Sequence, residues 1–317
     1  MYRLTDYCGM IADSVRLSAY RRALEAAVTP ASVVLDVGTG LGIFAILASR
    51  LGARRVFAVE PGDVIHLARR IAKDNGVADR IEFIQDFSTR ISLPERADVM
   101  ISDLRAVLPL FQHHIPSIVD ARERLLEPSA TLIPAQDSLW AAVIEAPESY
   151  QKFTRPWDEA LELDLLATHP ILTQMSRQLR AGPDQLVTEP TCWATLEYGT
   201  IESPNVEGRL RWDVTRKSVG HGLLVWFDTT LANGIGFSNA PGEAETIYGS
   251  EFFPFSSPIG LDPGDSIAVG LAANLVVDRY VWRWTTRVLS GGRDGDVKAD
   301  LSQTYLSTEM YSSERQR

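Results

Sequence analysis

A glycine-rich turn within residues 33–47, VVLDVGTGLGIFAIL, constrains the fold more than any other stretch of this chain. A β-branched run ends at Asp36, glycines follow at alternate positions (Gly38, Gly40 and Gly42), and an apolar helix pattern comes next. Glycines let a backbone turn sharply and approach a ligand closely, and the start of a helix offers free N–H groups. The turn therefore predicts a ligand site between a strand and a helix, with a purely structural tight turn as the alternative.

The glycine spacing and the next acidic residue indicate which class of ligand fits. Gly-x-Gly-x-Gly differs from the Gly-x-Gly-x-x-Gly of pyrophosphate binders, and no phosphate-binding lysine follows, as a P-loop would require. Glu60 ends the second strand, where its carboxylate can accept hydrogen bonds from both ribose hydroxyls. A nucleoside with an amino-acid tail and no phosphate matches this pattern. We therefore expect S-adenosylmethionine as cofactor, bound by Asp36, the three glycines and Glu60.

Strand and helix patterns alternate through the first half of the chain. Strands are expected at 33–36, 55–60, 81–85 and 97–102, and helices at 14–28, 43–50, 64–75 and 115–126. Strands that alternate with helices imply right-handed βαβ units and a parallel sheet covered on both faces. The expected fold class is therefore α/β, with a Rossmann-like cofactor-binding domain over residues 1–134.

The pattern changes after Pro134 to short strands separated by Gly, Pro and Asn. Strand patterns occur at 138–144, 191–198, 209–214, 222–231, 266–271 and 280–288, and a helical insertion is expected at about 147–184. Such a series predicts an antiparallel β-barrel or sandwich over residues 135–317. The polar tail after Leu289 is expected to fray.

Composition excludes several classes of function. The net charge is −10 and the pI is about 5.1, which argues against a nucleic-acid partner because such proteins normally carry a basic face. Cys8 and Cys192 stand far apart without nearby metal-ligand spacing, so no metal site is expected. The start has no signal-peptide core, and no stretch offers about 20 apolar residues for a membrane span. We expect a cytoplasmic protein.

Beyond the turn, the chain resembles the protein arginine methyltransferases, a family of class I S-adenosylmethionine-dependent methyltransferases, over almost its whole length. MIADSVRLSAY (10–20) is similar to the family's Met-x-x-Asp-x-x-Arg helix, which closes over the cofactor. By this resemblance Met10 packs near the sulfonium and Arg16 pairs with the methionine carboxylate, which suits a guanidinium fork. The family's acidic partner for the adenine amine falls on Thr89 or Arg90, and Asp86 is the nearest acidic substitute.

The second half carries the same resemblance. The segments DARERLLEPSATLIP (120–134), HGLLVWFDTTL (221–231) and GFSNAP (236–241) are similar to the helix that leads into the barrel and to central barrel strands. FTRPWDEALELDLLA (153–167) resembles the family's dimerisation arm and PDQLVT (183–188) the return from it. The resemblance implies a homodimer formed through residues 147–184 by an isologous contact. A helical flap packed on its own barrel is the alternative.

The acceptor end departs from the family pattern. The two glutamates that grip the substrate guanidinium in this family fall on Asp103 and Gln112, so one charge is lost and two donors are added. The Thr-His-Trp motif falls on Thr246-Ile247-Tyr248, which leaves Tyr248 as the aromatic wall. We expect Asp103 to orient or deprotonate the acceptor and Gln112 to position it, with Tyr7 and Tyr248 lining the acceptor pocket.

Arg105, His113 and His114 lie in sequence close to Asp103 and Gln112 and bear on which acceptor the site binds. Arg105 could pair with Asp103, which would weaken the case for an arginine substrate, or could meet an anionic substrate. His113 and His114 are expected at the surface rather than as general bases.

Three hypotheses follow for the function. The first is methyl transfer to an N or O atom of a non-standard acceptor, a small molecule or modified peptide. The second is a genuine protein arginine methyltransferase with an Asp/Gln clamp, although losing one charged partner of a buried cation commonly costs ~3–5 kcal/mol. The third is an inactive cofactor-binding scaffold or regulatory subunit.

Overall fold

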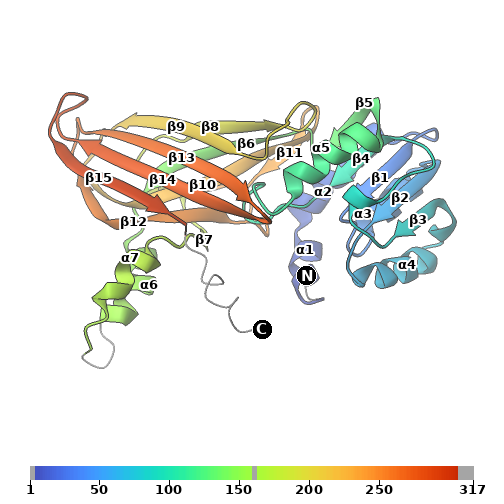
Figure 1. The fold of residues 1–317 in the computed structure, drawn as a ribbon, viewed down its shortest axis with the longest axis horizontal. Coiled ribbons are helices and arrows are strands. Elements are labelled where there is room, and N and C mark those ends of the chain that lie inside the picture. The colour runs from blue at the N-terminus through green and yellow to red at the C-terminus, as the bar shows by residue number, and fades with distance from the viewer. Residues whose placement is uncertain (1–3, 159–162, 306–317) are drawn as a thin grey trace.

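The computed structural model describes residues 4–158 and 163–305. A parallel α/β unit and a strand-rich unit lie beside each other along the long axis of the molecule, with helices α1 and α2 close to the junction (Figure 1). Helices α6 and α7 project from the strand-rich unit and belong to an arm whose described residues are 147–158 and 163–184 (Figure 1). Among the described residues, no helix is both long and apolar enough to cross a membrane.

The α/β unit contains a five-stranded parallel sheet in the order β3-β2-β1-β4-β5. Its strands are β1 (Val33–Val37), β2 (Arg55–Val59), β3 (Ile81–Ile84), β4 (Ala97–Ser102) and β5 (Leu126–Ile133). Its helices are α1 (Asp6–Ala12), α2 (Ser14–Ala27), α3 (Ile43–Arg50), α4 (Val64–Asp74) and α5 (His114–Arg124), with short 3-10 turns at Ala78–Arg80 and Ser88–Arg90. The α/β fold class and the alternating elements predicted for residues 14–124 are confirmed.

Strand β1 is buried on both faces because helices cover both sides of the sheet. Val34 faces the cluster that contains Tyr20 of α2 and Phe44 of α3, whereas Leu35 faces the cluster that contains Ile118 of α5. Successive side chains of a strand point to opposite faces, so an unbroken apolar run is what a doubly covered strand requires. This explains why VVLDV carries no polar alternation.

The strand-rich unit consists of two antiparallel sheets that pack face to face. One sheet has the order β7-β12-β10-β6-β8, with β11 paired to β10, and the other has the order β15-β14-β13-β9. The strands are β6 (Gln136–Ile144), β7 (Arg177–Leu179), β8 (Thr191–Glu197), β9 (Val206–Asp213), β10 (Ser218–Ala232), β11 (Ile235–Ser238), β12 (Ser250–Leu261), β13 (Ser266–Val276), β14 (Arg279–Leu289) and β15 (Val297–Thr304). Their shared core includes Phe253, whose ring lies 5.0 Å from Trp282 and 5.2 Å from Trp284.

The arm contains α6 (Pro147–Asp158), α7 (His169–Leu172) and 3-10 turns at Leu166–Thr168 and Pro183–Gln185. It is not wholly helical, because strand β7 within it pairs with β12. Trp157, Leu163, Leu166 and Ile171 are exposed on the arm, at 38%, 58%, 57% and 42%.

Several sequence predictions were wrong in detail. The helix expected to run to residue 126 ends at Arg124, and a strand, β5, follows despite the proline in it. Strand β12 was not predicted, and β11 was indicated only by the resemblance of GFSNAP (236–241) to a central barrel strand. Part of the tail expected to fray forms β15, while its end, residues 306–317, lies outside the described part of the chain. The helix expected from residue 14 is present as α2, and a shorter helix, α1, precedes it. Asp13 separates the two helices and caps α2 by accepting from the Arg16 N–H.

Candidate functional site

A cavity of about 340 Å³ opens at the carboxyl ends of strands β1, β2 and β4. The connection that leaves β1 goes to β2 on one side, while β4 lies on the other side of β1. Open α/β sheets bind ligands at such a switch point, because the two adjacent loops diverge there. The volume is in the range of small-ligand pockets.

The glycine turn forms one wall of the cavity. Gly38 has φ +73° and Gly40 has φ +53°, a region that only glycine adopts without strain. A Cβ at Gly38 would lie 2.3 Å from Leu104, and one at Gly40 would lie 3.0 Å from the Tyr7 ring. Glycine is therefore required at both positions, by the positive φ and by the lack of space for a Cβ. Because no side chain projects from these positions, a ligand can approach the backbone closely.

Glu60 follows β2 and is held in place by backbone donors. Its Oε1 accepts from the Gly62 N–H at 2.9 Å and its Oε2 from the Gly40 N–H at 3.2 Å. A carboxylate has about four lone-pair sites, so two remain for hydroxyl groups of a ligand. Asp86 also lines the cavity, beyond the end of β3.

Asp36 lies under the turn rather than in the cavity wall. Its Oδ2 accepts from the Thr39 hydroxyl and from the Ala45 N–H at 3.0 Å. Burial raises the pKa of Asp36 to about 7, against the opposing effect of these two hydrogen bonds. Asp36 therefore fixes the turn to the start of α3, and the prediction that it binds the cofactor stays a prediction.

Arg16 of helix α2 reaches into the cavity. Its Nη1 donates to Asp103 Oδ2 at 2.6 Å and its Nη2 donates to the Met10 carbonyl at 2.9 Å. Its Nε is buried and has no hydrogen-bond partner among the described residues. A buried guanidinium donor without a partner is costly, so the arrangement fits a ligand that brings a carboxylate.

Asp103, the first residue after β4, binds three side chains. Arg16 donates to Oδ2, Arg105 Nε donates to Oδ1 at 3.1 Å, and the Tyr248 hydroxyl lies 2.8 Å from both oxygens. Burial alone would raise the pKa of Asp103, but the two guanidinium groups and the hydroxyl lower it below its usual range. Asp103 is therefore a charged hydrogen-bond acceptor at neutral pH rather than a general acid.

Arg105 is completely buried and links the two units. Its Nη1 donates to Asp137 Oδ1 of β6 and to Thr229 Oγ1 of β10, each at 2.9 Å, and its Nη2 donates to the Tyr20 hydroxyl. Its Cζ also lies 5.3–5.8 Å from the ring centres of four aromatic residues, namely Tyr20, Phe227, Phe237 and Tyr248. The prediction that Arg105 could pair with Asp103 is confirmed.

His114 is buried, so its predicted surface position was wrong. Tyr198 donates its hydroxyl proton to Asp137 Oδ2 at 2.6 Å and lies 3.0 Å from His114 Nε2, which assigns that nitrogen as the donor. Burial and the nearby Arg105 charge lower the pKa of His114 to about 3. The imidazole is therefore neutral and part of a buried polar chain, not a general base at neutral pH.

Gln112 stands at the edge of the cavity without closing it. It has φ +42°, a left-handed conformation that is unfavourable for a residue with a side chain, and it is exposed. His113 beside it is exposed as predicted and also lines the cavity. In this structure Gln112 therefore lines the same cavity as Asp103, while its side chain remains open to solvent.

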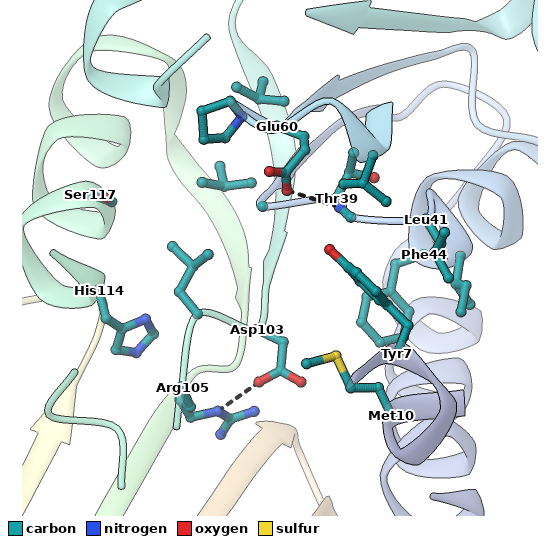
Figure 2. Close-up of a pocket in the computed structure, with 18 of the residues that line it drawn as sticks. Tyr7, Met10, Thr39, Leu41, Phe44, Glu60, Asp103, Arg105, His114 and Ser117 are labelled. Atoms are coloured by element: carbon teal, nitrogen blue, oxygen red, sulfur yellow. Dashed lines mark hydrogen bonds and ion pairs between the residues drawn. The ribbon is translucent and has the colours of Figure 1, made fainter. Parts of the chain in front are cut away.

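The residues predicted for cofactor and acceptor converge on this cavity. Its lining includes Tyr7, Met10, Arg16, Gly38, Gly40, Glu60, Asp86, Asp103, Gln112 and Tyr248, whereas Asp36 and Gly42 lie behind it. Figure 2 shows Glu60 and Asp103 toward different ends of the cavity, with Tyr7 and Met10 on one side and His114 on the other.

The buried chain from Arg105 through Asp137 and Tyr198 to His114 was missed from the sequence. Its members come from a loop, β6, the end of β8 and α5, so no spacing pattern connects them. The available signals were an arginine in the apolar run DLRAVLPLF and an aspartate at the start of the β6 pattern.

The residues at the glycine end fit S-adenosylmethionine. The glycine turn carries no side chains at Gly38 and Gly40, so a nucleoside can lie close to its backbone. Glu60 can accept further hydrogen bonds, as ribose hydroxyls would donate. The buried Arg16 Nε has no partner among the described residues and could donate to a carboxylate. None of these groups would satisfy a pyrophosphate, which needs several free backbone donors or a lysine.

Comparisons with known proteins show that the chain is similar to methyltransferases. Residues 20–133 match the family model described as ribosomal protein L11 methyltransferase (PrmA). Arabidopsis thaliana protein arginine N-methyltransferase PRMT10 is 29% identical over 303 residues, covering 83% of this chain and 78% of its own. A probable protein arginine N-methyltransferase 6 of the same plant is 27% identical over 250 residues, covering 76% of this chain and 57% of its own.

Coverage of the relatives is partial. Protein arginine N-methyltransferase 2 of Dictyostelium discoideum is 26% identical over 236 residues, covering 71% of this chain and 46% of its own. The chain thus spans about half the length of the first curated relatives it matches.

Solved structures share the fold across both units. The Trypanosoma brucei PRMT1 enzyme–prozyme heterotetrameric complex with AdoHcy has a TM-score of 0.85 at 21% identity, covering 96% of this chain and 99% of that one. Arabidopsis protein arginine methyltransferase 10 in an open conformation has a TM-score of 0.82 at 24% identity, covering 96% and 97%. In sequence this chain is similar to protein arginine N-methyltransferases, and it shares its two-unit fold with solved structures of such enzymes.

Proposed function

We propose that this protein is an S-adenosylmethionine-dependent methyltransferase whose acceptor is an arginine side chain of a protein or peptide. One observation carries the proposal: a single cavity is lined by Glu60, Arg16 and Asp103, and the sequence resemblance matches Asp103 to a glutamate that grips the acceptor in arginine methyltransferases. A methyl donor at one end and an acceptor at the other would share this enclosed space.

The side chains support a transfer that depends on alignment. Glu60 would accept from the ribose hydroxyls, and Arg16 would donate to the methionine carboxylate. The cofactor, when bound, supplies an activated methyl group. Asp103 accepts a hydrogen bond from the acceptor nitrogen and turns its lone pair toward the donor end, and such alignment can contribute ~7–11 kcal/mol to lowering a barrier.

The choice of arginine comes from the relatives. Sequence relatives of this chain are named as protein arginine methyltransferases, which favours the second hypothesis from the sequence over a non-standard acceptor. The negative charge of Asp103, maintained by its lowered pKa, suits a cationic acceptor.

A second candidate is a cofactor-binding subunit that works beside an active chain. The observation in its favour is that Asp103 already has three side-chain partners and that Gln112 supplies no charge. One structural neighbour is named as an enzyme–prozyme heterotetrameric complex, so this fold occurs in an assembly of that kind.

We further propose a homodimer in the cytoplasm, formed through the arm. Four exposed apolar side chains, Trp157, Leu163, Leu166 and Ile171, support a contact there, because a surface of this kind is unfavourable in water. Light scattering after size exclusion would show a mass near twice 35.1 kDa, and Leu166→Glu would shift it to the monomer. If the wild type and the variant are both monomers, the alternative is favoured in which the arm is a helical flap on its own barrel.

The experiment that tests the activity uses labelled S-adenosylmethionine with a pool of arginine-containing peptides and, in parallel, a cell extract. Label on arginine supports the proposed function. Label only on a small molecule of the extract would restore the non-standard acceptor. If no label is transferred in either assay, although calorimetry shows that S-adenosylhomocysteine binds, the cofactor-binding subunit is favoured.

A further inference from the structure

The acceptor carboxylate of Asp103 is almost saturated before any acceptor arrives. An ionised carboxylate has about four lone-pair sites, and Arg16, Arg105 and Tyr248 occupy three of them. A guanidinium that binds side-on needs one free site on each oxygen. The present contacts leave one site, so an incoming guanidinium could make only one hydrogen bond to Asp103.

Of the two arginines, only Arg16 can leave Asp103 for a ligand, because other buried side chains hold Arg105 in place. Arg16 lines the cavity and can turn its fork toward a ligand carboxylate. The Arg105 side chain has 0% exposure and is anchored by Asp137 and Thr229. Turning Arg105 away from Asp103 would leave Asp137, also 0% exposed, as a buried charge without its partner.

The aromatic cage strengthens this anchoring. Phe227 and Phe237 place their ring centres 5.3 and 5.6 Å from the Arg105 Cζ, and Tyr20 and Tyr248 lie at 5.8 and 5.7 Å. Cations are attracted to ring faces at such distances. Arg105 therefore occupies, inside the protein, the kind of environment that would otherwise bind a substrate cation.

We propose that Arg105 is an internal counter-cation of Asp103 and a specificity-determining residue that lowers the affinity of the acceptor site for a guanidinium. Arg105 donates a hydrogen bond to an Asp103 oxygen that a side-on guanidinium would need. Its positive charge also repels the positive charge of such a guanidinium. The inference rests on the proposed function, because it takes the acceptor site to be the Asp103 end of the cavity. It goes beyond that function by explaining how the site discriminates among acceptors.

The test measures binding rather than turnover. An arginine-containing peptide is titrated into the protein loaded with S-adenosylhomocysteine, for wild type and for Arg105→Met, which keeps an unbranched apolar chain without charge. Freed from one hydrogen bond to a charged group, Asp103 should bind the peptide about tenfold or more tightly. A citrulline peptide, which has the same shape without the charge, should gain no more than about twofold.

Two further variants separate specificity from folding. Arg105→Met removes the cationic partner of Asp137, so the double variant Arg105→Met with Asp137→Asn removes both buried charges and keeps an acceptor oxygen for Tyr198. It should unfold at a higher temperature than the single variant and show the same gain for the arginine peptide. Arg105→Lys keeps the charge and should bind the peptide as wild type does.

The outcomes distinguish this inference from the proposed function. The inference is overturned when the double variant folds and binds S-adenosylhomocysteine as wild type does, yet binds the arginine peptide no more tightly. An equal gain for the citrulline peptide, or for Arg105→Lys, would overturn it as well. If the peptide affinity rises as expected while no variant transfers label to arginine, the inference stands and the proposed function fails.

Discussion

Arg16 and Asp103 are 87 residues apart in the sequence and form an ion pair of 2.6 Å between Nη1 and Oδ2. The pair joins helix α2 to the loop after β4, and so connects the cofactor end of the cavity to the acceptor end. If a ligand carboxylate accepts the hydrogen bond that Arg16 Nη1 now donates, Asp103 Oδ2 becomes free to accept one from the methyl acceptor. Cofactor and acceptor binding should therefore favour each other.

Replacing Arg16 tests its role at the cofactor end. Arg16→Met should weaken S-adenosylhomocysteine binding by about tenfold or more, because a charge-assisted hydrogen bond to the carboxylate is lost. Isothermal titration calorimetry measures the dissociation constant. Arg21→Met on the same helix, where the arginine is exposed and pairs only with Glu25, is the matched control. Equal affinities for the two variants would count against the assignment.

Replacing Glu60 tests ribose recognition. Glu60→Gln exchanges one acceptor oxygen for an amide donor that would face the N–H of Gly40 or Gly62, and affinity for S-adenosylhomocysteine should fall about tenfold or more. Glu82→Gln, at an exposed ion pair with Arg55 on the neighbouring strand, should change affinity by less than about twofold. An unchanged affinity in the Glu60 variant would remove Glu60 from the cofactor site.

Restoring the second carboxylate tests the acceptor clamp. Gln112→Glu should raise methyl transfer to arginine peptides about tenfold, because it adds a charged acceptor opposite Asp103. Initial rates with labelled S-adenosylmethionine provide the measurement. His113→Glu adds the same charge one residue away and should give a much smaller gain. A complete loss of arginine transfer in the Gln112 variant would show that a carboxylate at this position does not hold the guanidinium productively.

The pH dependence of stability tests the buried chain at His114. The pKa of His114 is lowered from 6.5 to about 3, so the folded protein does not take up the proton that the unfolded chain binds below pH 6.5. This group contributes stability above pH 6.5 that is lost as the pH falls toward 3, by up to about 1.4 kcal/mol per pH unit.

His114→Gln keeps a neutral hydrogen-bonding group and should make the free energy of unfolding fall less steeply between pH 6.5 and 4.5. Denaturant titrations at several pH values measure it, with the exposed neighbour variant His113→Gln as the control. The opposite trend, a steeper fall in His114→Gln than in wild type, would show that the imidazole is charged in the folded state.

Local pattern was sufficient for the α/β unit. The apolar run at 33–37, the three glycines and the helix from Ile43 were predictable because a doubly covered strand and a turn with positive φ each permit few residue types. The cofactor-type residues Glu60 and Arg16 followed from their places at the end of a strand and in a helix motif.

Local pattern was insufficient where contacts between distant segments decide the structure. Strands β5 and β15 have weak alternation of their own and form because β4 and β14 offer them partners. His114 looked like a surface residue beside His113, but the packing of α5 against Tyr198 buries it.

The sequence by itself determined the fold class and the glycine turn, and it predicted Gln112 at the position of a clamp glutamate. Only the tertiary structure decided that Asp103 is held by Arg16, Arg105 and Tyr248 at once. The physical reason is that a carboxylate's free capacity depends on donors from α2, from its own loop and from the barrel, which the chain brings together only when both units pack.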